Sequence, residues 1–488
     1  MDKLTSNLSS AYRGFGAAAT VVLCACSSAS DSEQLPNIVY ILADDLGYGD
    51  LSCYGQTKFN TPNIDNLASR GMLFTQHYSG SSVSAPSRSS LLTGEHTGHT
   101  PIRGNLEMTE CEGQHPIEAN YSTLLKLLKE RGYTTSVVGK WGLGYPQSEG
   151  DPNNQYVDEF FGYNCQRLAH HYYPDYLWHN QEKYMLEGNQ GLNKGQYAPD
   201  VIHDKAIEFI ESSSEQPFFL FYASPIPHAE MAAPEECIAQ FRGKFLPETS
   251  YEGVDSGERY KLGAYGSQRE CNAAFAAMVT KLDTQVGEIV AKLEELNLMD
   301  NTLVIFASDN GPSNEGGSNP NYFDSNGVLR GYKRDLYEGG IRVPMIARWD
   351  GVVGSGVTTD HISAFWDVMP TIADMLNEPR QSSFDGLSML PTLTGRGVQQ
   401  EHPHLYWEFH ENGGRQALRI GDWKGVIYNV SDSSSELELY NLATDVEERY
   451  NVVKYHPEIA ARILAIIDTS RTESEYYKFA SDRFDGDK

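Results

Sequence analysis

The chain has 488 residues, with 38 Lys and Arg against 66 Asp and Glu, which gives a formal net charge of −28. This balance excludes a nucleic-acid backbone as the partner, because it leaves no basic patch of useful size. Apolar residues make up 40% of the chain, and 44 Gly and 22 Pro are scattered along it, as is typical of a globular protein. We expect two or three domains, or one large domain with an appendage.

The first 25 residues have the composition of a secretory signal peptide. Lys3 and Arg13 precede a short apolar stretch, residues 14–23, and small residues follow it. We therefore predict that residues 1–25 are a signal peptide and that the protein is exported. Residues 26–35 then form a short tether.

The end of this leader, Leu23-Cys24-Ala25-Cys26, also resembles a bacterial lipobox. A lipobox would make Cys26 the lipidated first residue of the mature chain, although Cys24 replaces the usual small residue. Ordinary signal cleavage nearby is the alternative. No apolar run reaches the length of a membrane-spanning helix, so we expect membrane contact only through such a lipid anchor. The expected location is the bacterial periplasm, or the outer membrane as a lipoprotein facing the periplasm or the cell surface.

After the tether, strand-like apolar runs alternate with helical patterns. This alternation predicts an α/β domain over residues 36–395, with a large, mainly parallel sheet flanked by helices. The expected strands are Ile38–Ala43, Thr134–Val138, Phe218–Ala223, Thr302–Ala307 and Val343–Arg348. The expected helices are Asn63–Arg70, Thr123–Arg131 and Ala273–Leu296.

Beyond residue 395 the pattern changes to shorter, strand-like pieces. We predict a smaller C-terminal α+β subdomain over residues 396–488, which contains a short antiparallel sheet and packs on the first domain. Its expected elements are the strands His404–His410, Leu418–Ile420, Val426–Tyr428 and Leu437–Tyr440 and the amphipathic helix Pro457–Asp468.

Polar side chains follow three of the expected strands. Asp44-Asp45 comes after the first, and Asp309-Asn310 comes after the fourth, while Lys140 ends the second. Ligands of parallel α/β sheets bind beyond the carboxyl ends of the strands, so we expect these residues to meet there. Carboxylate and amide oxygens suit a hard divalent cation, Ca²⁺ or alternatively Mg²⁺.

The segment Ser84-Ala85-Pro86-Ser87-Arg88-Ser89-Ser90-Leu91-Leu92-Thr93-Gly94 begins like a helix, with Pro near its start. Ser84 then lies at the amino end, where free N–H groups and the helix dipole favour an anion. A hydroxyl group in that place, with Arg88 one turn further on, has the character of a nucleophile beside a planar cation. A serine cap on an ordinary helix is the alternative from the residues alone.

This segment resembles the signature of the type I sulfatases, C/S-x-P-x-R-x-x-x-L-T-G, a family with the alkaline-phosphatase-like fold. The resemblance extends from about Asn37 to Val453, and its motifs follow one another in family order. The further matches are Asp44-Asp45 and Asp309-Asn310 with the metal pairs, Gly139-Lys140-Trp141 with the sulfate-binding lysine, Pro227-His228 with the catalytic histidine, and Lys333 before Glu338-Gly339-Gly340 with the second lysine.

The resemblance implies a mechanism. Ser84 would be oxidised to formylglycine, whose hydrate attacks the sulfur of a sulfate ester and then eliminates sulfate. Ser84 in this form would also be a ligand of the divalent cation. Arg88 and Lys140 would stabilise the hydrate and the transition state, Lys333 would neutralise the sulfate oxygens, and His228 would protonate the leaving oxygen. Because position 84 is Ser rather than Cys, a radical maturase of the serine type is the implied partner.

The chain departs from the family at Gly142, where the motif Gly-Lys-Trp is usually followed by a histidine. That histidine is often assigned to accept the hydrate proton. By residue type the candidates for its role are His96, His99, His170 and His171, and the mixed run from Gln166 to Tyr173 favours His170. Solvated loop histidines are the alternative.

The implied substrate is a sulfated carbohydrate, without indication of the sugar or of the ester position. The residues expected to contact it are Arg167, His170, His171, Trp407, His410 and Arg415. Two other functions remain open from the sequence. One is a phosphatase or phosphodiesterase that uses unmodified Ser84 as its nucleophile, and the other is an inactive lipoprotein that binds sulfated glycans.

Overall fold

The computed structural model describes residues 35–110, 112–432 and 434–479. The predicted signal peptide, the lipidation of Cys26 and nearly all of the tether lie outside these residues and stay predictions. Among the residues described, no helix is both long enough and apolar enough to cross a membrane.

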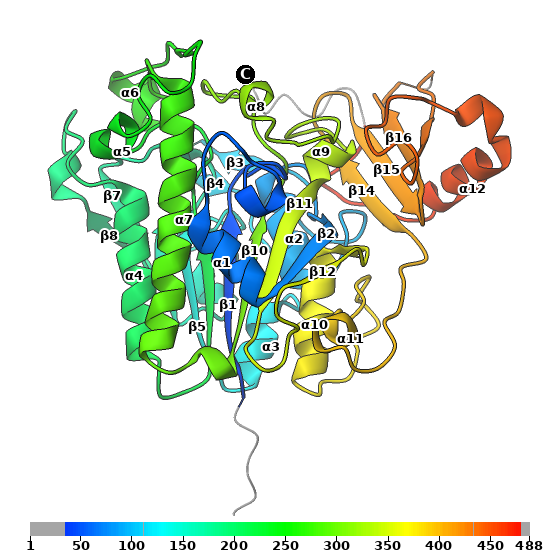
Figure 1. Cartoon of the computed structure of the whole chain (residues 1–488), viewed down its shortest axis with the longest axis horizontal. Coiled ribbons are helices and arrows are strands. Elements are labelled where there is room, and N and C mark those ends of the chain that lie inside the picture. Colours follow the sequence, from blue (N-terminus) through cyan, green and yellow to red (C-terminus); the bar gives the residue numbers. More distant parts are fainter. Residues whose placement is uncertain (1–34, 111, 433, 480–488) are drawn as a thin grey trace, which may run out of the picture. The chain divides into compact units, whose positions relative to one another are not determined.

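An eleven-stranded sheet organises most of the chain (Figure 1). Its strands are β1 (Asn37–Ala43), β2 (Met72–Tyr78), β5 (Thr134–Lys140), β6 (Glu159–Tyr163), β7 (Tyr176–His179), β8 (Glu182–Met185), β9 (Phe218–Ala223), β10 (Thr302–Ser308), β11 (Arg342–Arg348), β12 (Val357–Thr359) and β13 (Ser363–Ala364). They follow the order β12-β2-β11-β10-β1-β9-β5-β6-β7-β8, with β13 also paired to β2. A separate two-stranded hairpin consists of β3 (Glu107–Thr109) and β4 (Gly113–Gln114).

The centre of the large sheet is parallel, as predicted. β1 lies between β10 and β9, and β5 lies between β9 and β6, all in parallel register. The strand expected at Val343–Arg348 is present as β11, but it runs antiparallel to β10. The chain between β10 and β11 holds only the short helices α8 (Pro320–Phe323) and α9 (Glu338–Ile341), so no long helix crosses back over the sheet before β11 begins.

Helices cover both faces of the sheet, which explains why β1 is buried along its whole length. Val39, Ile41 and Ala43 of β1 face the cluster under α1, α4 and α7, whereas Ile38, Tyr40 and Leu42 face the cluster under α2, α3 and α10. These helices are α1 (Pro62–Arg70), α2 (Ser84–Thr93), α3 (Leu124–Glu130), α4 (Ala198–Ser212), α7 (Cys271–Glu295) and α10 (Val368–Met375). The shorter ones are α5 (Glu235–Ala239), α6 (Gly257–Lys261) and α11 (Leu390–Thr394).

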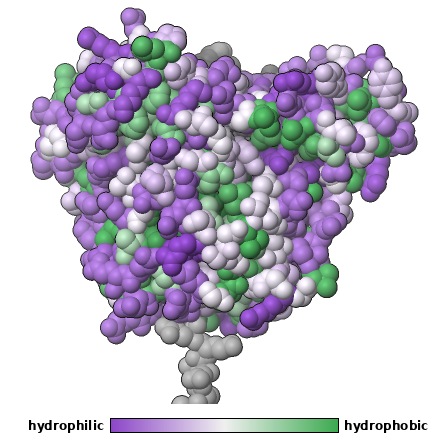
Figure 2. Space-filling view, in the orientation of Figure 1, coloured by the Kyte–Doolittle hydropathy of each residue, from purple (hydrophilic) through white to green (hydrophobic). Residues whose placement is uncertain are grey.

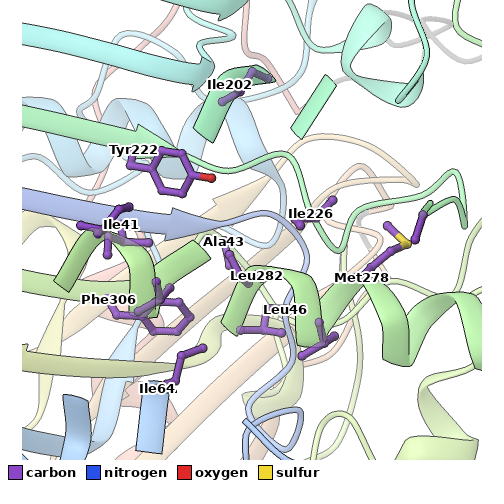
Figure 3. Close-up of a cluster of buried hydrophobic side chains, with 14 of the residues drawn as sticks. Ile41, Ala43, Leu46, Ile64, Ile202, Tyr222, Ile226, Met278, Leu282 and Phe306 are labelled. Atoms are coloured by element: carbon purple, nitrogen blue, oxygen red, sulfur yellow. The ribbon is translucent and has the colours of Figure 1, made fainter. Parts of the chain in front are cut away.

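Close to the carboxyl ends of the strands, the core is tightly apolar (Figure 3). Ala43 of β1 lies near Phe306 of β10 and Leu282 of α7, and Leu46 and Ile226 follow the ends of their strands into the same cluster. The two chain segments that lead into the polar edge of the sheet therefore start from a packed apolar base, which fixes the directions of the residues beyond it.

The C-terminal part forms a four-stranded antiparallel sheet, as predicted. Its strands are β14 (Leu405–Phe409), β15 (Arg415–Ile420), β16 (Trp423–Tyr428) and β17 (Glu438–Asn441), paired in that order. The helix α12 (Pro457–Ile467) packs on this sheet through Ala460, Ile463 and Ile467. In the view of Figure 2 most of the surface is hydrophilic, with small hydrophobic areas on the side of this sheet.

The C-terminal sheet shares an apolar cluster with the larger part of the molecule. Trp407 and Val426 of this sheet lie in one buried cluster with Tyr78 of β2, Val83 before α2 and Trp366. The chain from Leu35 onward groups into a single compact unit. The boundary that we placed between residues 395 and 396 stays a prediction.

Candidate active site

The acidic residues expected as metal ligands lie together at the carboxyl edge of the sheet. Ala43 of β1 stands opposite Ser308 of β10, so Asp44-Asp45 and Asp309-Asn310 leave the sheet side by side. All four side chains are buried. The Asp45 backbone N–H donates to Asp309 Oδ1 (3.1 Å), and Asn310 Nδ2 donates to Asp45 Oδ1 (2.7 Å). Asp45 adopts a left-handed φ of 62°, which is uncommon for a residue other than glycine and is found at sites that constrain the backbone.

Ser84 is the first residue of α2 and is only 2% exposed. Its Oγ donates to Asp44 Oδ1 (3.1 Å) and accepts from Lys140 Nζ (3.3 Å). The next backbone N–H, that of Ala85, donates to Asn105 Oδ1 (3.0 Å). The expected helix start is therefore present, and its dipole favours a negative charge beside the Ser84 side chain.

Three buried cations each pair with one of the three buried carboxylates at this edge. The one-to-one pairing makes the cluster electrically neutral as it stands, so a divalent cation would leave it with an excess of positive charge that an anionic substrate can balance. The pairs are Arg88 Nη2 with Asp309 Oδ2 (2.9 Å), Lys140 Nζ with Asp44 Oδ2 (2.6 Å) and Lys333 Nζ with Asp45 Oδ2 (2.8 Å).

The surroundings shift the pKa values of Asp44 and Asp309 in opposite directions. Burial would raise the pKa of Asp44, but Lys140 and the other cations around it hold that pKa well below its ordinary value. Burial and the neighbouring Asp44 carboxylate raise the pKa of Asp309 to about 6. Burial lowers the pKa of Lys140. Burial would also lower the pKa of Lys333, but Asp45 and the other acidic groups around it raise that pKa above its ordinary value.

His228 completes the inner part of the site. Its Nδ1 contacts the backbone carbonyl of Ala229, which places the proton on Nδ1, and its Nε2 accepts from Lys333 Nζ (2.9 Å). Burial, and then Lys333, lower the pKa of His228 to about 3, so the ring is neutral. The ring of His170 stacks on it with a centroid distance of 5.1 Å, and His170 Nδ1 contacts the carbonyl of Gly263 (2.9 Å).

The residues at this edge fit a divalent cation. Asp44, Asp45 and His228 each offer a ligand atom, and these atoms lie within 4.8 Å of one another. Asn310 Oδ1 is buried and has no hydrogen-bond partner among the described residues, so it is available as a further oxygen ligand. Asp309 lies beside the cluster, but a backbone N–H holds one of its oxygens and a guanidinium holds the other. Carboxylate and amide oxygens in this number favour Ca²⁺ or Mg²⁺.

A cleft of about 750 Å³ opens onto these groups. Two of the predicted substrate residues, Arg167 and His170, line it, and Arg167 donates to the Glu107 carboxylate through Nε (2.9 Å) and Nη2 (2.7 Å). The other lining residues from the predicted site are Ser84, Lys140, His228 and Lys333.

Three residues of the C-terminal sheet that were expected to contact a sugar do not line this cleft, and that prediction is wrong. Trp407 is fully buried, and its Nε1 donates to a backbone carbonyl of the shared core (2.9 Å). His410 is buried against Glu408, with 2.9 Å between Nε2 and Oε1. Arg415 Nη1 is held by Asp335 Oδ1 (2.9 Å). The sequence pattern suggested a solvated strand end, but every residue of β14 is buried.

The other candidate histidines also lie outside the cleft. His171 is buried against the ring of Tyr260 and lines a neighbouring cavity of about 360 Å³. His96 and His99 stack on each other, and His99 Nδ1 lies 2.9 Å from Asp385 Oδ2. Of the four candidates named for the role of the missing histidine, His170 alone lines the cleft.

Sequence reasoning missed several residues that line the cleft. Gln166 fills the space that a side chain at position 142 would take, Tyr265 packs on His170, and Glu315 Oε2 lies 3.7 Å from Lys333 Nζ. The glycine at position 142 was a signal that another group occupies this place. Tyr265 and Glu315 lie in loops, where no periodicity marks a residue as inward-facing.

Comparisons with known proteins identify one family. The profile of the sulfatase family matches residues 36–378, and the profile described as N-sulphoglucosamine sulphohydrolase, C-terminal, matches residues 330–470. The N-acetylgalactosamine-6-O-sulfatase of Bacteroides thetaiotaomicron is 30% identical over 90% of this chain and 94% of that protein. Human arylsulfatase A is 29% identical over 86% of this chain and 83% of that protein.

The solved structures similar to this fold include that of Ps i-CgsB in complex with k-i-k-neocarrahexaose. It has a TM-score of 0.73 and 26% identity, and the match covers 91% of this chain and 95% of that one. Since the sulfatase profile extends over well more than half of the chain, and a sulfatase at 30% identity spans nearly all of it, the protein belongs to the sulfatase family and is a sulfuric ester hydrolase.

Proposed function

We propose that the protein hydrolyses the sulfate ester of a sulfated sugar, with Ser84 in the oxidised, formylglycine form as its nucleophile. One observation carries the proposal: Ser84 Oγ lies within hydrogen-bond reach of both Asp44 and Lys140, at the start of a helix and on the wall of the cleft. A nucleophile in this position meets an anionic sulfate group where the helix dipole and the nearby cations stabilise it.

The chain's own residues supply binding and orientation for this reaction. Asp44, Asp45, Asp309 and Asn310, together with the oxidised Ser84, would hold the divalent cation, and such a cation supplies Lewis-acid polarisation of a sulfate oxygen and of the nucleophile. Formylglycine supplies a hydrate, whose two hydroxyl groups separate attack on sulfur from release of sulfate. Arg88 orients this edge by donating through Nη1 to the Lys140 carbonyl (2.7 Å), which fixes the loop that carries the lysine.

We assign the proton for the leaving sugar oxygen to the pair formed by His228 and Lys333. In the reaction the ester S–O bond breaks, the sugar leaves as an alcohol with one added proton, and water supplies the oxygen that ends on sulfate. Nε2 of the neutral His228 ring carries no proton and accepts from Lys333 Nζ across 2.9 Å, so the proton for the leaving oxygen comes from the Lys333 ammonium group and passes through Nε2. Glu315, 3.7 Å from Lys333 Nζ, helps to keep that amine protonated.

A carbohydrate is the substrate class that the cleft supports best. Its volume of about 750 Å³ is much larger than a sulfate ion needs, and polar and aromatic side chains line it together. Two of the similar proteins are named for sugars: one is an N-acetylgalactosamine-6-O-sulfatase, and the other has a structure in complex with a neocarrahexaose.

The two other functions considered from the sequence gain less support. A two-metal phosphatase or phosphodiesterase would need a second set of ligands in the cleft. The second metal-compatible group among the described residues is His96, His99 and Asp385, and none of these lines the cleft. An inactive glycan-binding lipoprotein would have no use for the buried ion-pair cluster, which burial makes costly to maintain.

The test is to identify the form of Ser84 and then to assay the same preparation. The protein is produced in its native host, or together with a radical maturase of the serine type, and the peptide with Ser84 is analysed by mass spectrometry. We expect loss of two hydrogen atoms, reaction with a hydrazide, and release of sulfate from at least one sugar in a panel of sulfated mono- and disaccharides. Full activity with unmodified Ser84 would instead support the serine-nucleophile alternative.

A second arm tests the assignment of the site. Lys333→Ala and Asp309→Ala are expected to abolish turnover of the best sugar, whereas Lys58→Ala, which removes a cation from an exposed ion pair, is the matched control. Retention of activity by either site variant would refute the assignment. Export and lipidation are part of the proposal, and mass analysis of the mature amino terminus checks whether it begins at Cys26 and carries lipid.

A further inference from the structure

Two loops meet at the carboxyl edge next to Lys140. β5 and β6 are parallel neighbours with Lys140 opposite Tyr163, so the chain after each strand continues side by side. The Trp141 N–H donates to the Tyr163 carbonyl (2.9 Å), and the Gly142 N–H donates to the Asn164 carbonyl (3.0 Å). The segment that leads to residue 166 therefore lies directly over the segment that carries the cleft lysine.

The side chain of Gln166 lies where a side chain of residue 142 would be. A Cβ atom built on Gly142 would be 1.8 Å from Gln166 Nε2 and 2.8 Å from its Cδ. Gly142 also has φ of +81°, a conformation that residues with a Cβ adopt only at a cost. The absence of a side chain at Gly142 thus leaves a space, and the amide of Gln166 fills that space.

The amide nitrogen of Gln166 is buried without a partner in the part of the chain that the structure describes. The residue is 8% exposed, and no hydrogen-bond acceptor for Nε2 is present among the described residues. A buried donor in this state is unfavourable unless something outside the chain accepts its hydrogen bond. Gln166 lines the same cleft as Ser84, Lys140 and His228, so the acceptor can come from a ligand in that cleft.

The charged donors that line the cleft differ from Gln166 in this respect. The amines of Lys140 and Lys333 are each paired with a carboxylate, whereas Arg88, whose Nε also has no partner among the described residues, does not line the cleft. Among the described residues, Gln166 Nε2 has no such competing partner. Its N–H is therefore the donor that gains most when an oxygen enters the cleft, and it adds specificity without changing the charge of the site.

We propose that Gln166 Nε2 donates a hydrogen bond to an oxygen of the sulfate group that is held beside Ser84. The inference rests on the proposed function, because it takes sulfate as the group bound there. Gln166 is then a residue that contacts the substrate, and the lack of a side chain at Gly142 is what makes room for this contact.

The experiment measures binding of inorganic sulfate, which is the product and needs no turnover. Thermal stabilisation by sodium sulfate is compared with that by sodium chloride at equal ionic strength, and the inhibition constant of sulfate is measured wherever the enzyme turns over. Gln166→Ala is expected to weaken sulfate binding on the order of 10- to 100-fold, the effect of losing a hydrogen bond to a charged acceptor. Gln166→Glu is expected to weaken it further, since it places a carboxylate beside the anion.

Gln416→Ala is the matched control. Gln416 is similarly buried, at 6% exposure, but its Nε2 donates to the hydroxyl group of Tyr406 (2.7 Å), and it does not line the cleft. Its loss is expected to lower the melting temperature and to leave sulfate affinity within twofold of the wild type.

A double-mutant cycle separates contact from general damage. Gly142→Ala in the wild type forces the Gln166 amide out of its place and is expected to weaken sulfate binding nearly as much as Gln166→Ala. In the Gln166→Ala background the same substitution is expected to change sulfate affinity by less than about threefold, because the amide that it displaces is already gone.

The outcomes are distinct. If the wild type releases sulfate from sugars but Gln166→Ala binds sulfate as tightly as the wild type, the inference is wrong and the proposed function stands. Additive effects of Gly142→Ala and Gln166→Ala would likewise overturn it. If the wild type neither binds sulfate nor turns over any sulfated sugar, the proposed function itself fails.

Discussion

Replacement of Arg88 by methionine tests how strongly the buried ion pairs hold the active-site edge together. Arg88 and Asp309 are both 0% exposed, so the Asp309 carboxylate loses its ion pair in a place that water does not reach. Breaking a buried pair by removing one partner typically costs about 3–5 kcal/mol in the free energy of unfolding. We expect Arg88→Met to lose this amount and to lose turnover as well.

Arg348→Met is the control, because Arg348 is equally buried but its partners are not. Glu294 and Asp350 are 43% and 21% exposed, so water can solvate them when the arginine is gone. Here we expect a loss of only about 1–2 kcal/mol, the sum of two weak surface pairs, and unchanged turnover. Urea unfolding in EDTA, followed by tryptophan fluorescence, measures both variants.

The pH dependence of the Arg88→Met deficit provides an internal check. The pKa of Asp309 is already raised to about 6 by burial and Asp44, and it rises further without the guanidinium. A carboxyl group with a higher pKa in the folded than in the unfolded protein destabilises the fold at pH values above its unfolded pKa. The loss of unfolding free energy in Arg88→Met is therefore expected to be larger at pH 8 than at pH 5. Equal losses for Arg88→Met and Arg348→Met, or a deficit that grows toward acid pH, would refute the reasoning.

Three further predictions concern the divalent cation, His99 and Trp407. Removal of divalent cations with EDTA is expected to abolish sulfate release and to lower the melting temperature. Addition of Ca²⁺ or Mg²⁺ is expected to restore both. Full activity after dialysis against EDTA would argue against a cation at Asp44 and Asp45. A hydrogen bond to Asp385 raises the pKa of His99, so the interaction between the two residues stabilises the fold at acid pH and is lost as the pH rises through the folded pKa. The unfolding midpoints of the wild type and His99→Asn are therefore expected to converge between pH 5.5 and pH 8.5. A constant difference between the two midpoints would contradict this. Trp407→Phe removes the donor to the Ser79 carbonyl and is expected to cost about 1–3 kcal/mol of stability without a change in KM for the sugar; a raised KM with intact stability would return Trp407 to the substrate site.

The parts of the site that follow strand ends could be predicted from the sequence. A parallel sheet brings the ends of its neighbouring strands to one edge, so the order of apolar runs and polar endings was enough to place Asp44, Lys140 and Asp309 together. The helix start at Ser84 could be read from local signals in the same way. These predictions needed only short-range patterns and one rule of topology.

The residues that could not be predicted depend on contacts between distant segments. Trp407 and His410 looked like members of a solvated strand end, but the core that buries Trp407 also contains residues of β2 and of the segment before α2, more than 300 positions earlier. Gln166 was likewise unremarkable until the pairing of β5 and β6 placed it over Gly142. No local periodicity encodes either fact.

The burial of α2 bears on when the oxidation proposed for Ser84 would have to take place. Every residue of this helix is buried, and Ser84 shows 2% of its surface. A modifying enzyme that binds the backbone around Ser84 has no access to it once the protein has folded. The oxidation that we propose for Ser84 would therefore take place on the newly made polypeptide before it folds. A chain that folds first would keep an unmodified serine at position 84.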